Sequence, residues 1–125
     1  MDYSKLSDQE INQLIGKIIS RDGLSIIAYN GNAVIHEYSD CGDFKGVCLG
    51  WKAFDPCNNP ADAWPIIVDN SIGIKKQSNG LWVSSRHGGM YPQYHENPLR
   101  AAMIVFLMMQ ESANVPANST GSDIR

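Results

Sequence analysis

The sequence predicts an α+β fold, in which an antiparallel sheet of about four to six strands is flanked by an N-terminal and a C-terminal helix. Three observations predict it: apolar residues at helical spacing near the N-terminus, short β-branched and aromatic runs in the middle, and a long apolar run near the C-terminus. We expect both helices to pack on one face of the sheet. The domain should span residues 1–112, and residues 113–125 should form a disordered polar tail.

The first helix has a well-marked start. Ser7 stands at the N-cap position and Glu10 follows three residues later, which is the capping-box arrangement. An apolar stripe at helical spacing follows, and it consists of Ile11, Leu14, Ile15, Ile18 and Ile19. The helix should end near Asp22 and Gly23, because glycine readily takes the left-handed conformation that closes many helices.

Two strands are predicted at residues 24–29 and 33–38, which are rich in β-branched and aromatic residues. Asn30 and Gly31 lie between them and favour a type I′ hairpin turn. Residues 41–46 indicate a loop, because they are rich in Gly and Asp. Residues 47–54 fit either a further strand or an irregular connection that carries aromatic side chains.

A second helix is predicted to start after Asn59, which can cap it, with Pro60 at the first helical position and Asp62 in the first turn. Pro65 should limit this helix to one turn around residues 61–64. Further strands are predicted at residues 65–68, 71–76 and 81–85, with a tight turn at residues 78–80.

Residues 86–96 indicate a loop, since they contain two consecutive glycines and a proline. The last helix is predicted to start at Asn97 and Pro98 and to run from Leu99 to about Ser112. Its sequence is apolar on nearly every face, so we expect it to be buried on more than one side.

The composition indicates one globular domain, since 43% of the 125 residues are hydrophobic and 18% are charged. The formal net charge of −3 makes nucleic acid an unlikely partner, because non-specific binding to phosphates requires a basic surface. No apolar run approaches the roughly 20 residues that cross a bilayer, so no membrane partner is expected. An odd number of cysteines without a secretion signal predicts reduced thiols in the cytoplasm.

A zinc site is one chemical possibility, and its candidate ligands are His36, Cys41, Cys48 and Cys57. These residues are 5, 7 and 9 positions apart, whereas paired ligands of structural zinc sites are usually separated by two to four residues. We therefore expect no metal and no cofactor, and we interpret the cysteines as small buried hydrophobic residues.

A small hydrolase is an open alternative. His87 and His95 flank an aromatic segment next to Glu96, and Cys57 precedes a predicted helix N-terminus, which lowers the pKa of a thiol. None of the common zinc-protease, serine-hydrolase, P-loop or dinucleotide-binding motifs occurs in the sequence. We therefore favour a protein that binds over one that catalyses, and we name no catalytic residue.

A site for a small phosphorylated or nucleotide-like ligand is the preferred hypothesis. Two helix N-termini expose N–H groups, Arg100 places a cation against the dipole of the last helix, and tryptophans offer flat apolar surfaces. The predicted ligand-binding residues are Asn58, Asn59, Asp62, Trp64, Trp82 and Arg100. In the structural alternative, Arg100 pairs with Asp62 or Glu96 and the tryptophans lie in the core.

Three stretches carry a family resemblance. Residues 57–67 (CNNPADAWPII) and 97–107 (NPLRAAMIVFL), together with DYSKLS at residues 2–7, resemble the NinX-like bacteriophage accessory proteins, a family of unknown function. The resemblance covers the first helix, the central segment to about Ser85 and the last helix, and it is weakest over residues 24–54. It implies a protein of tailed phages or prophages of enteric bacteria, located in the host cytoplasm. It implies no reaction and no catalytic residue.

Small accessory phage proteins of this kind often act by binding, and their targets include host proteins and, in some phage families, the nucleotide signals of host immunity. The resemblance thus favours a non-enzymatic binding module that captures a small phosphorylated ligand to counter a host process. A protein–protein interaction module, either a homodimer or an inhibitor of a host protein, is the alternative. It is motivated by the apolar last helix, because a domain of this size need not cover every face of that helix.

Overall fold

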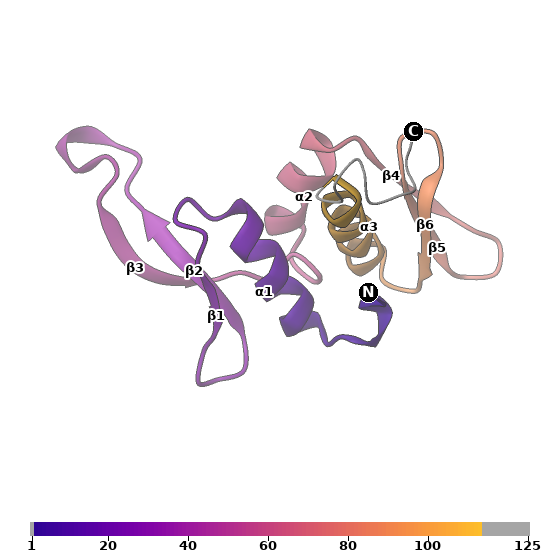
Figure 1. Cartoon of the computed structure of the whole chain (residues 1–125), viewed down its shortest axis with the longest axis horizontal. Helices are drawn as coiled ribbons and strands as arrows, with labels where there is room; N and C mark the ends of the chain where they lie inside the picture. The colour runs from indigo at the N-terminus through magenta and orange to yellow at the C-terminus, as the bar shows by residue number, and fades with distance from the viewer. Residues whose placement is uncertain (1, 114–125) are drawn as a thin grey trace, which may run out of the picture.

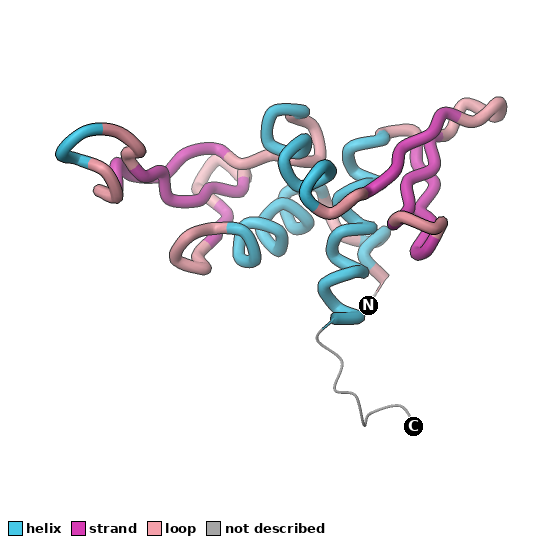
Figure 2. The backbone as a smooth tube through the Cα atoms, turned by 90° about the horizontal axis from the view of Figure 1, so that it is seen from above, coloured by secondary structure: helices cyan, strands magenta, loops and turns pink. Residues whose placement is uncertain are grey.

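Three α-helices lie between two three-stranded antiparallel sheets (Figure 1, Figure 2). The computed structural model describes residues 2–113. In chain order its elements are α1 (Asp8–Ile19), β1 (Ser25–Ile27), β2 (Ala33–Tyr38), β3 (Cys48–Ala53), α2 (Pro60–Asp69), β4 (Ile72–Lys76), β5 (Trp82–Arg86), β6 (Met90–His95) and α3 (Pro98–Ala113), with 3-10 turns at Tyr3–Lys5 and Gly42–Phe44.

The α+β class and the order of helix, strands and helix are confirmed, with six strands in the described residues. The strands form two sheets, β1-β2-β3 and β4-β5-β6, so the expected packing of both terminal helices on one sheet face is wrong. The division follows from α2, which interrupts the series of strands. As a result α1 packs on β1 and β2, whereas α3 packs on β4, β5 and β6 and also contacts α1 and α2.

The predicted start of α1 is confirmed. The Ser7 side chain accepts a hydrogen bond from the Glu10 N–H, and the Glu10 side chain accepts one from the Ser7 N–H. The helix ends at Ile19, earlier than predicted. Gly16 allows a close approach to the first sheet, because a Cβ at that position would lie 2.5 Å from Ser25 Oγ. The helix therefore presses directly on the sheet.

The first sheet contains the two predicted strands and a third, β3, within residues 47–54. The predicted type I′ turn is wrong, because Gly31 has a positive φ of 87° but Asn30 does not. The Gly31 N–H donates to the Ala28 carbonyl at 2.8 Å, and the Ala28 N–H donates to the Asn32 carbonyl at 2.8 Å. This pattern is that of a three-residue loop with a glycine bulge.

The predicted cap of α2 is confirmed, since Asn59 Oδ1 accepts from the Ala61 N–H at 3.0 Å. The helix continues through Pro65 to Asp69, so the predicted single turn and the predicted strand at residues 65–68 are both wrong. Proline removes one backbone hydrogen bond from a helix. The burial of Ile66 and Ile67 against the core offsets that loss.

The second sheet contains the predicted strands β4 and β5, but β6 occupies a segment predicted to be a loop. Gly88 and Gly89 both take positive φ angles, of 88° and 81°, which lets the chain reverse after β5. Pro92 is accommodated because β6 is an edge strand whose register shifts opposite Ser84 and Arg86. The two glycines thus allow the turn that precedes β6, and Pro92 is compatible with an edge strand.

The last helix, α3, forms the centre of the core. Asn97 Oδ1 accepts from the Leu99 N–H at 3.0 Å, which confirms the predicted cap. Every residue from Arg100 to Leu107 is buried, as expected for a helix that is apolar on most faces. The predicted tail of residues 113–125 lies outside the described residues, except for Ala113, the last residue of α3.

Candidate functional site

The N-terminal ends of the three helices meet in a polar cluster, which we call the junction cluster. It consists of the side chains of Asp8, Asn12, Asp55, Asn58, Asn97 and Arg100. Asp8 is the first residue of α1, Asn97 caps α3, and Asp55 and Asn58 precede α2. Helix N-termini carry partial positive charge, so carboxylates are favoured there.

Arg100 is the buried cation of the junction cluster, with 9% of its surface exposed. Its guanidinium donates to the Asp8 carboxylate at 2.6 Å and to the backbone carbonyls of Ser4 and Leu6 at 3.1 and 2.7 Å. The alternative pairing of Arg100 with Asp62 or Glu96 is wrong. These bonds tie α3 to the segment that precedes α1, which explains a cation in the first turn of a helix.

Asp8 balances this cation. Burial alone raises the pKa of Asp8, but hydrogen bonds from Asn58 and Arg100 outweigh burial and hold the pKa below its ordinary value. Asp8 therefore stays ionised near neutral pH and neutralises Arg100.

The amide side chains of the junction cluster fix the loop before α2. Asn12 donates to Asp55 Oδ1 at 2.7 Å and accepts from the Cys57 N–H at 3.1 Å. Asn97 donates to the Cys57 carbonyl at 2.8 Å. The loop is thus held from both sides, by α1 and by α3.

Two of the predicted ligand residues, Asn58 and Arg100, share a partner, whereas the others have different surroundings. Asn58 and Arg100 both contact Asp8, while the Asp62 carboxylate accepts from the Asp55 N–H at 3.0 Å. Trp64 is 62% exposed, so its predicted alternative as a core residue is wrong. Trp82 lies on β5, with the Lys76 ammonium 5.0 Å from its ring centroid. A ligand at these residues stays a prediction.

The candidate residues for a hydrolase do not converge. Cys57 is fully buried, and burial followed by the nearby Asp8 carboxylate raises the pKa of its thiol to about 12. This is the reverse of the lowering expected at a helix N-terminus. His87 precedes β6 and His95 ends it, and a strand of that length spans roughly 20 Å.

The candidate zinc ligands are also apart. Cys41 and Cys48 are exposed, whereas Cys57 is buried beside the junction cluster. Among the described residues, no group of three or more His, Cys, Asp and Glu side chains is placed to hold a metal ion.

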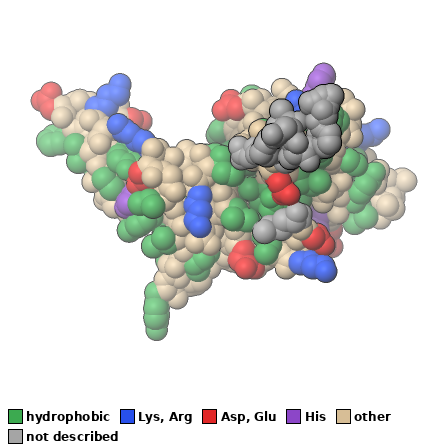
Figure 3. Space-filling model, in the orientation of Figure 1, with side chains coloured by type: hydrophobic (Ala, Val, Ile, Leu, Met, Phe, Trp, Pro, Cys, Tyr) green, Lys and Arg blue, Asp and Glu red, His purple; other side chains and the backbone are tan. Residues whose placement is uncertain are grey.

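The most exposed apolar surface lies on the last two residues of α1, the first sheet and its loops, residues 18–54, which we call the arm. Of the large hydrophobic side chains that are exposed in the described residues, ten of fourteen lie in this segment. They are Ile18, Ile19, Leu24, Ile26, Ile27, Tyr29, Phe44, Val47, Leu49 and Trp51. Hydrophobic side chains gather on the arm at the left of Figure 3.

One face of the arm packs on α1, through Ser25 and Ile35. The opposite face, which we call the outer face, carries the alternate side chains of the strands, namely Ile26, Val34, His36, Tyr38 and Trp51. The His36 and Trp51 rings stack with their centroids 3.8 Å apart. In the described residues, no helix or second sheet covers this face (Figure 1).

The charged groups at the outer face are already paired. Asp22 accepts from the Tyr38 hydroxyl at 3.0 Å and contacts His36 Nδ1, and the Arg21 guanidinium lies 4.8 Å from the Tyr38 ring centroid. The hydrogen bond with His36 is the main cause that lowers the pKa of Asp22 to about 2. The face therefore combines apolar area with polar groups that already bond or stack with one another.

Sequence reasoning missed the outer face, although β2 contains a signal of it. A sheet with one solvated face normally alternates apolar and polar residues. Ala33 and Ile35 face α1, yet the side chains between and after them are Val34, His36 and Tyr38. The face of β2 opposite α1 thus carries one aliphatic side chain and two rings, where a solvated face normally carries charged or small polar residues, and this pattern predicts that the face needs cover.

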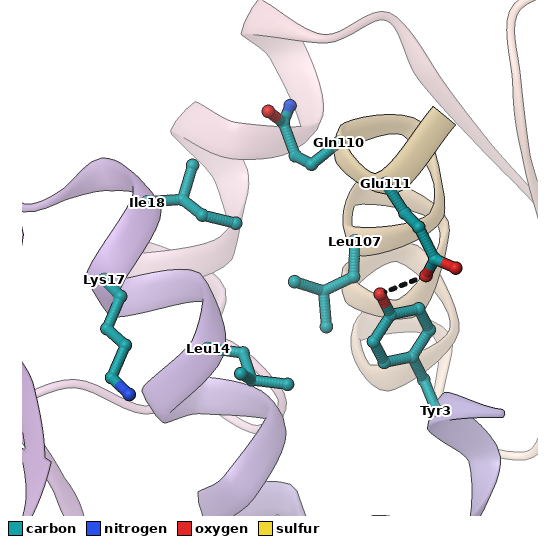
Figure 4. Close-up of a pocket in the computed structure, with 7 residues that line it drawn as sticks. All are labelled: Tyr3, Leu14, Lys17, Ile18, Leu107, Gln110 and Glu111. Carbon is teal, nitrogen blue, oxygen red and sulfur yellow. Dashed lines mark hydrogen bonds between the residues drawn. The ribbon is translucent and has the colours of Figure 1, made fainter. Parts of the chain in front are cut away.

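A separate groove of about 540 Å³ lies between α1 and the C-terminal half of α3 (Figure 4). Leu14, Ile18 and Leu107 form its apolar walls, and Lys17 and Gln110 lie at its edge. The Tyr3 hydroxyl donates to Glu111 across one side. The groove borders the end of the described chain at Ala113.

The fold and these surfaces define a small α+β protein in which a helical core separates two sheets, one of them with an uncovered face. No helix in the described residues has the length and apolar character needed to cross a membrane. The chain belongs to the family of bacteriophage P22 NinX, whose family model matches residues 2–110, including residues 24–54. No curated protein and no solved structure matches the chain.

Proposed function

We propose that this phage protein is a non-enzymatic binding module whose arm docks on a protein of the bacterial host. The observation that carries the proposal is the concentration of exposed apolar side chains on the arm. Monomeric soluble proteins rarely expose large contiguous apolar patches, and such patches commonly mark protein-binding sites. The arm supplies the aromatic residues that are enriched at the centre of protein interfaces.

The charge of one loop of the arm indicates the kind of partner. Residues 37–44, between the outer face and the exposed Phe44, contain Glu37, Asp40 and Asp43 and no basic residue. A partner with an apolar patch and a basic rim would complement both the outer face and this acidic loop. A second copy of the chain fits less well, because it would bring the same acidic loop to the interface.

The predicted capture of a small phosphorylated ligand at Asn58, Asn59 and Arg100 receives less support from the geometry. The guanidinium donates to a carboxylate and two carbonyls, and the Asn59 side chain caps α2. An anion at Arg100 would have to replace these bonds. The arm offers uncovered surface without such a cost.

The test uses matched surface variants. Phe44→Ser/Leu49→Ser removes two arm side chains that are 70% and 61% exposed. Met90→Ser/Tyr94→Ser removes two side chains of β6 that are 48% and 56% exposed. Each tagged protein is used to purify partners from lysate of an enteric host, and any candidate is then purified and titrated by calorimetry.

We expect one host protein to bind the wild type and the β6 variant with similar affinity, and to bind the arm variant at least about tenfold more weakly. Equal binding to all three proteins would refute the arm as the interface. Light scattering distinguishes the remaining case: a dimer that the arm variant abolishes would identify a second copy as the occupant and would also refute the proposal.

A further inference from the structure

The three arginines of the described residues differ in the partners of their guanidinium groups. Arg100 is buried and bonded to Asp8, and Arg21 lies over the Tyr38 ring. Arg86, at the end of β5, is exposed, and within residues 2–113 its side chain has no ion pair or hydrogen bond. Within these residues, its five N–H donors therefore have no protein acceptor.

Arg86 lies in the most basic stretch of an acidic chain. No Asp or Glu occurs from Asn70 to His95, whereas this stretch contains Lys75, Lys76 and Arg86. The formal net charge of the whole chain is −3. The uneven distribution makes the second sheet the region with the strongest attraction for an anion.

Two adjoining hollows meet at Ser71, where α2 gives way to β4, and together we call them the Ser71 groove. One, of about 310 Å³, is apolar and is lined by Trp64, Ile67, Val68, Ser71, Ile72 and Ile74. The other, of about 500 Å³, is lined by Asp69, Asn70, Ser71, Arg86, His87 and Met109. The groove thus has an aromatic end and a basic end.

The two ends are separated by a length that suits a small molecule. Trp64 lines the apolar hollow and Asp69 lines the basic one, and these residues are five positions apart along α2, which corresponds to a rise of about 8 Å. Trp64 is 62% exposed, so its ring is open to stacking. Ser71 has a positive φ of 53°, which a glycine would adopt with less strain, and in the described residues its hydroxyl has no hydrogen bond.

We propose that the Ser71 groove binds a nucleotide, with the base on Trp64 and the phosphate on Arg86 and His87. Aromatic side chains stack on bases, and guanidinium groups bind phosphate with two parallel hydrogen bonds. Asp69 is the one acidic residue of the lining, and it repels a phosphate but accepts hydrogen bonds from hydroxyl groups. A ligand with sugar hydroxyls between its ring and its phosphate meets all three requirements.

This site is independent of the arm. It uses one tryptophan of the ligand hypothesis, Trp64, but it replaces Arg100 with Arg86, whose donors have no partner within residues 2–113. It also provides an aromatic and a basic group within one groove.

The experiment titrates the ¹⁵N-labelled chain with the four ribonucleoside 5′-monophosphates, and separately with adenosine and with inorganic phosphate. The indole N–H of Trp64 gives its own NMR signal, so stacking is read directly, and the backbone amide signals of Ser71 and His87 follow binding in all variants. The test variants are Trp64→Ala and Arg86→Ala. Their matched controls are Trp51→Ala and Lys52→Ala, an exposed tryptophan and an exposed lysine of the arm.

We expect at least one nucleotide to shift the Trp64 indole signal with a Kd below about 1 mM. Each test variant should weaken that binding about tenfold or more, and each control should change it less than about twofold. Three results would overturn the proposal: no shift with any nucleotide, binding that Arg86→Ala leaves unchanged, or equal affinity for inorganic phosphate alone. Phe44→Ser/Leu49→Ser should leave nucleotide binding intact, which separates this result from the fate of the arm proposal.

Discussion

The junction cluster and the arm differ in how their side chains find partners. In the junction cluster, Arg100 donates to Asp8, a residue 92 positions away in the chain, and Asn97 donates to the Cys57 carbonyl, 40 positions away. On the arm, Phe44 and Leu49 are 70% and 61% exposed, and the outer face has no covering layer in the described residues. The cluster connects three helices, whereas the arm connects to the rest of the fold through one of its faces.

This difference distinguishes residues that hold the fold together from residues that are open to a partner. Asn58, Asn59 and Arg100 have the chemistry of a binding site, but Asn58 and Arg100 bond to Asp8 of α1 and Asn59 caps α2. The arm has few polar motifs and yet leaves apolar area uncovered. A buried polar network holds one arrangement of the helices, so we place function on surfaces whose groups lack partners.

Cysteine reactivity should give the largest contrast between the two regions. Cys41 and Cys48 are exposed on the arm, whereas Cys57 is buried beside the junction cluster. The pKa of Cys57 is raised from 9.0 to about 12. Thiolate is the reactive form and burial also blocks access to the sulfur, so we expect alkylation at about pH 8 to add two groups quickly and the third at least about a hundredfold more slowly. Intact-protein mass spectrometry follows the three steps.

The control for this measurement is the unfolded chain. In concentrated guanidinium chloride all three thiols should react at similar rates, because burial no longer protects Cys57. A native protein that takes up three groups at one rate would show that the core near Cys57 is open, and the account of the junction cluster would fail with it.

Removal of the buried guanidinium should have the largest effect on stability. Arg100→Ala leaves Asp8 and the carbonyls of Ser4 and Leu6 without their donor. Loss of one partner from a buried ion pair costs about 3–5 kcal/mol, and we expect about 2–4 kcal/mol here because Asp8 is 30% exposed. Urea unfolding measures the change.

Arg86→Ala is the matched control, because Arg86 is exposed and has no partner in the described residues. Its free energy of unfolding should stay within about 0.5 kcal/mol of the wild type. If the two variants unfold alike, the bonds of Arg100 do not stabilise the fold.

Much of the fold could be predicted because the signals are local. The caps at Ser7, Asn59 and Asn97 depend on residues within a few positions, and all three predictions are confirmed. The length of α2 and the strand β6 were missed, because tertiary packing overrides Pro65 and an edge position tolerates Pro92. Long-range partners were missed because they depend on tertiary structure. No local pattern indicates that Arg100 pairs with Asp8.

A smaller effect on stability is expected at Asn97, whose side-chain amide both caps α3 and bonds to the loop before α2. Asn97→Ala removes the cap of α3 and the bond to the Cys57 carbonyl, and should cost about 1–2 kcal/mol in urea unfolding. Asn97→Ser keeps an oxygen that can cap and loses only the donor, so it should lie between the wild type and the alanine variant. Asn30→Ala on the arm, which removes one exposed turn bond to the Asn32 N–H, should cost only a few tenths of a kcal/mol. A serine variant as stable as the wild type would show that the bond to Cys57 contributes nothing.

The smallest expected effect is the loss of stability at low pH that comes from Asp22 at the outer face. The pKa of Asp22 is lowered to about 2 from an ordinary 3.8, mainly by the hydrogen bond with His36. A lowered pKa in the folded state means that the contribution is present above 3.8 and is lost as the pH falls toward 2. Asp22→Asn should therefore lose less stability than the wild type between about pH 5 and pH 2.

The comparison of the two proteins isolates this contribution. Other carboxylates with lowered pKa values, such as Asp8, titrate in both proteins, so their effect cancels in the difference between the two urea midpoints. A difference that stays constant with pH would mean that Asp22 and His36 do not interact in solution. The loop that carries Asp22 would then not bond to the sheet. The outer face would present His36 and Tyr38 without the carboxylate that they contact here.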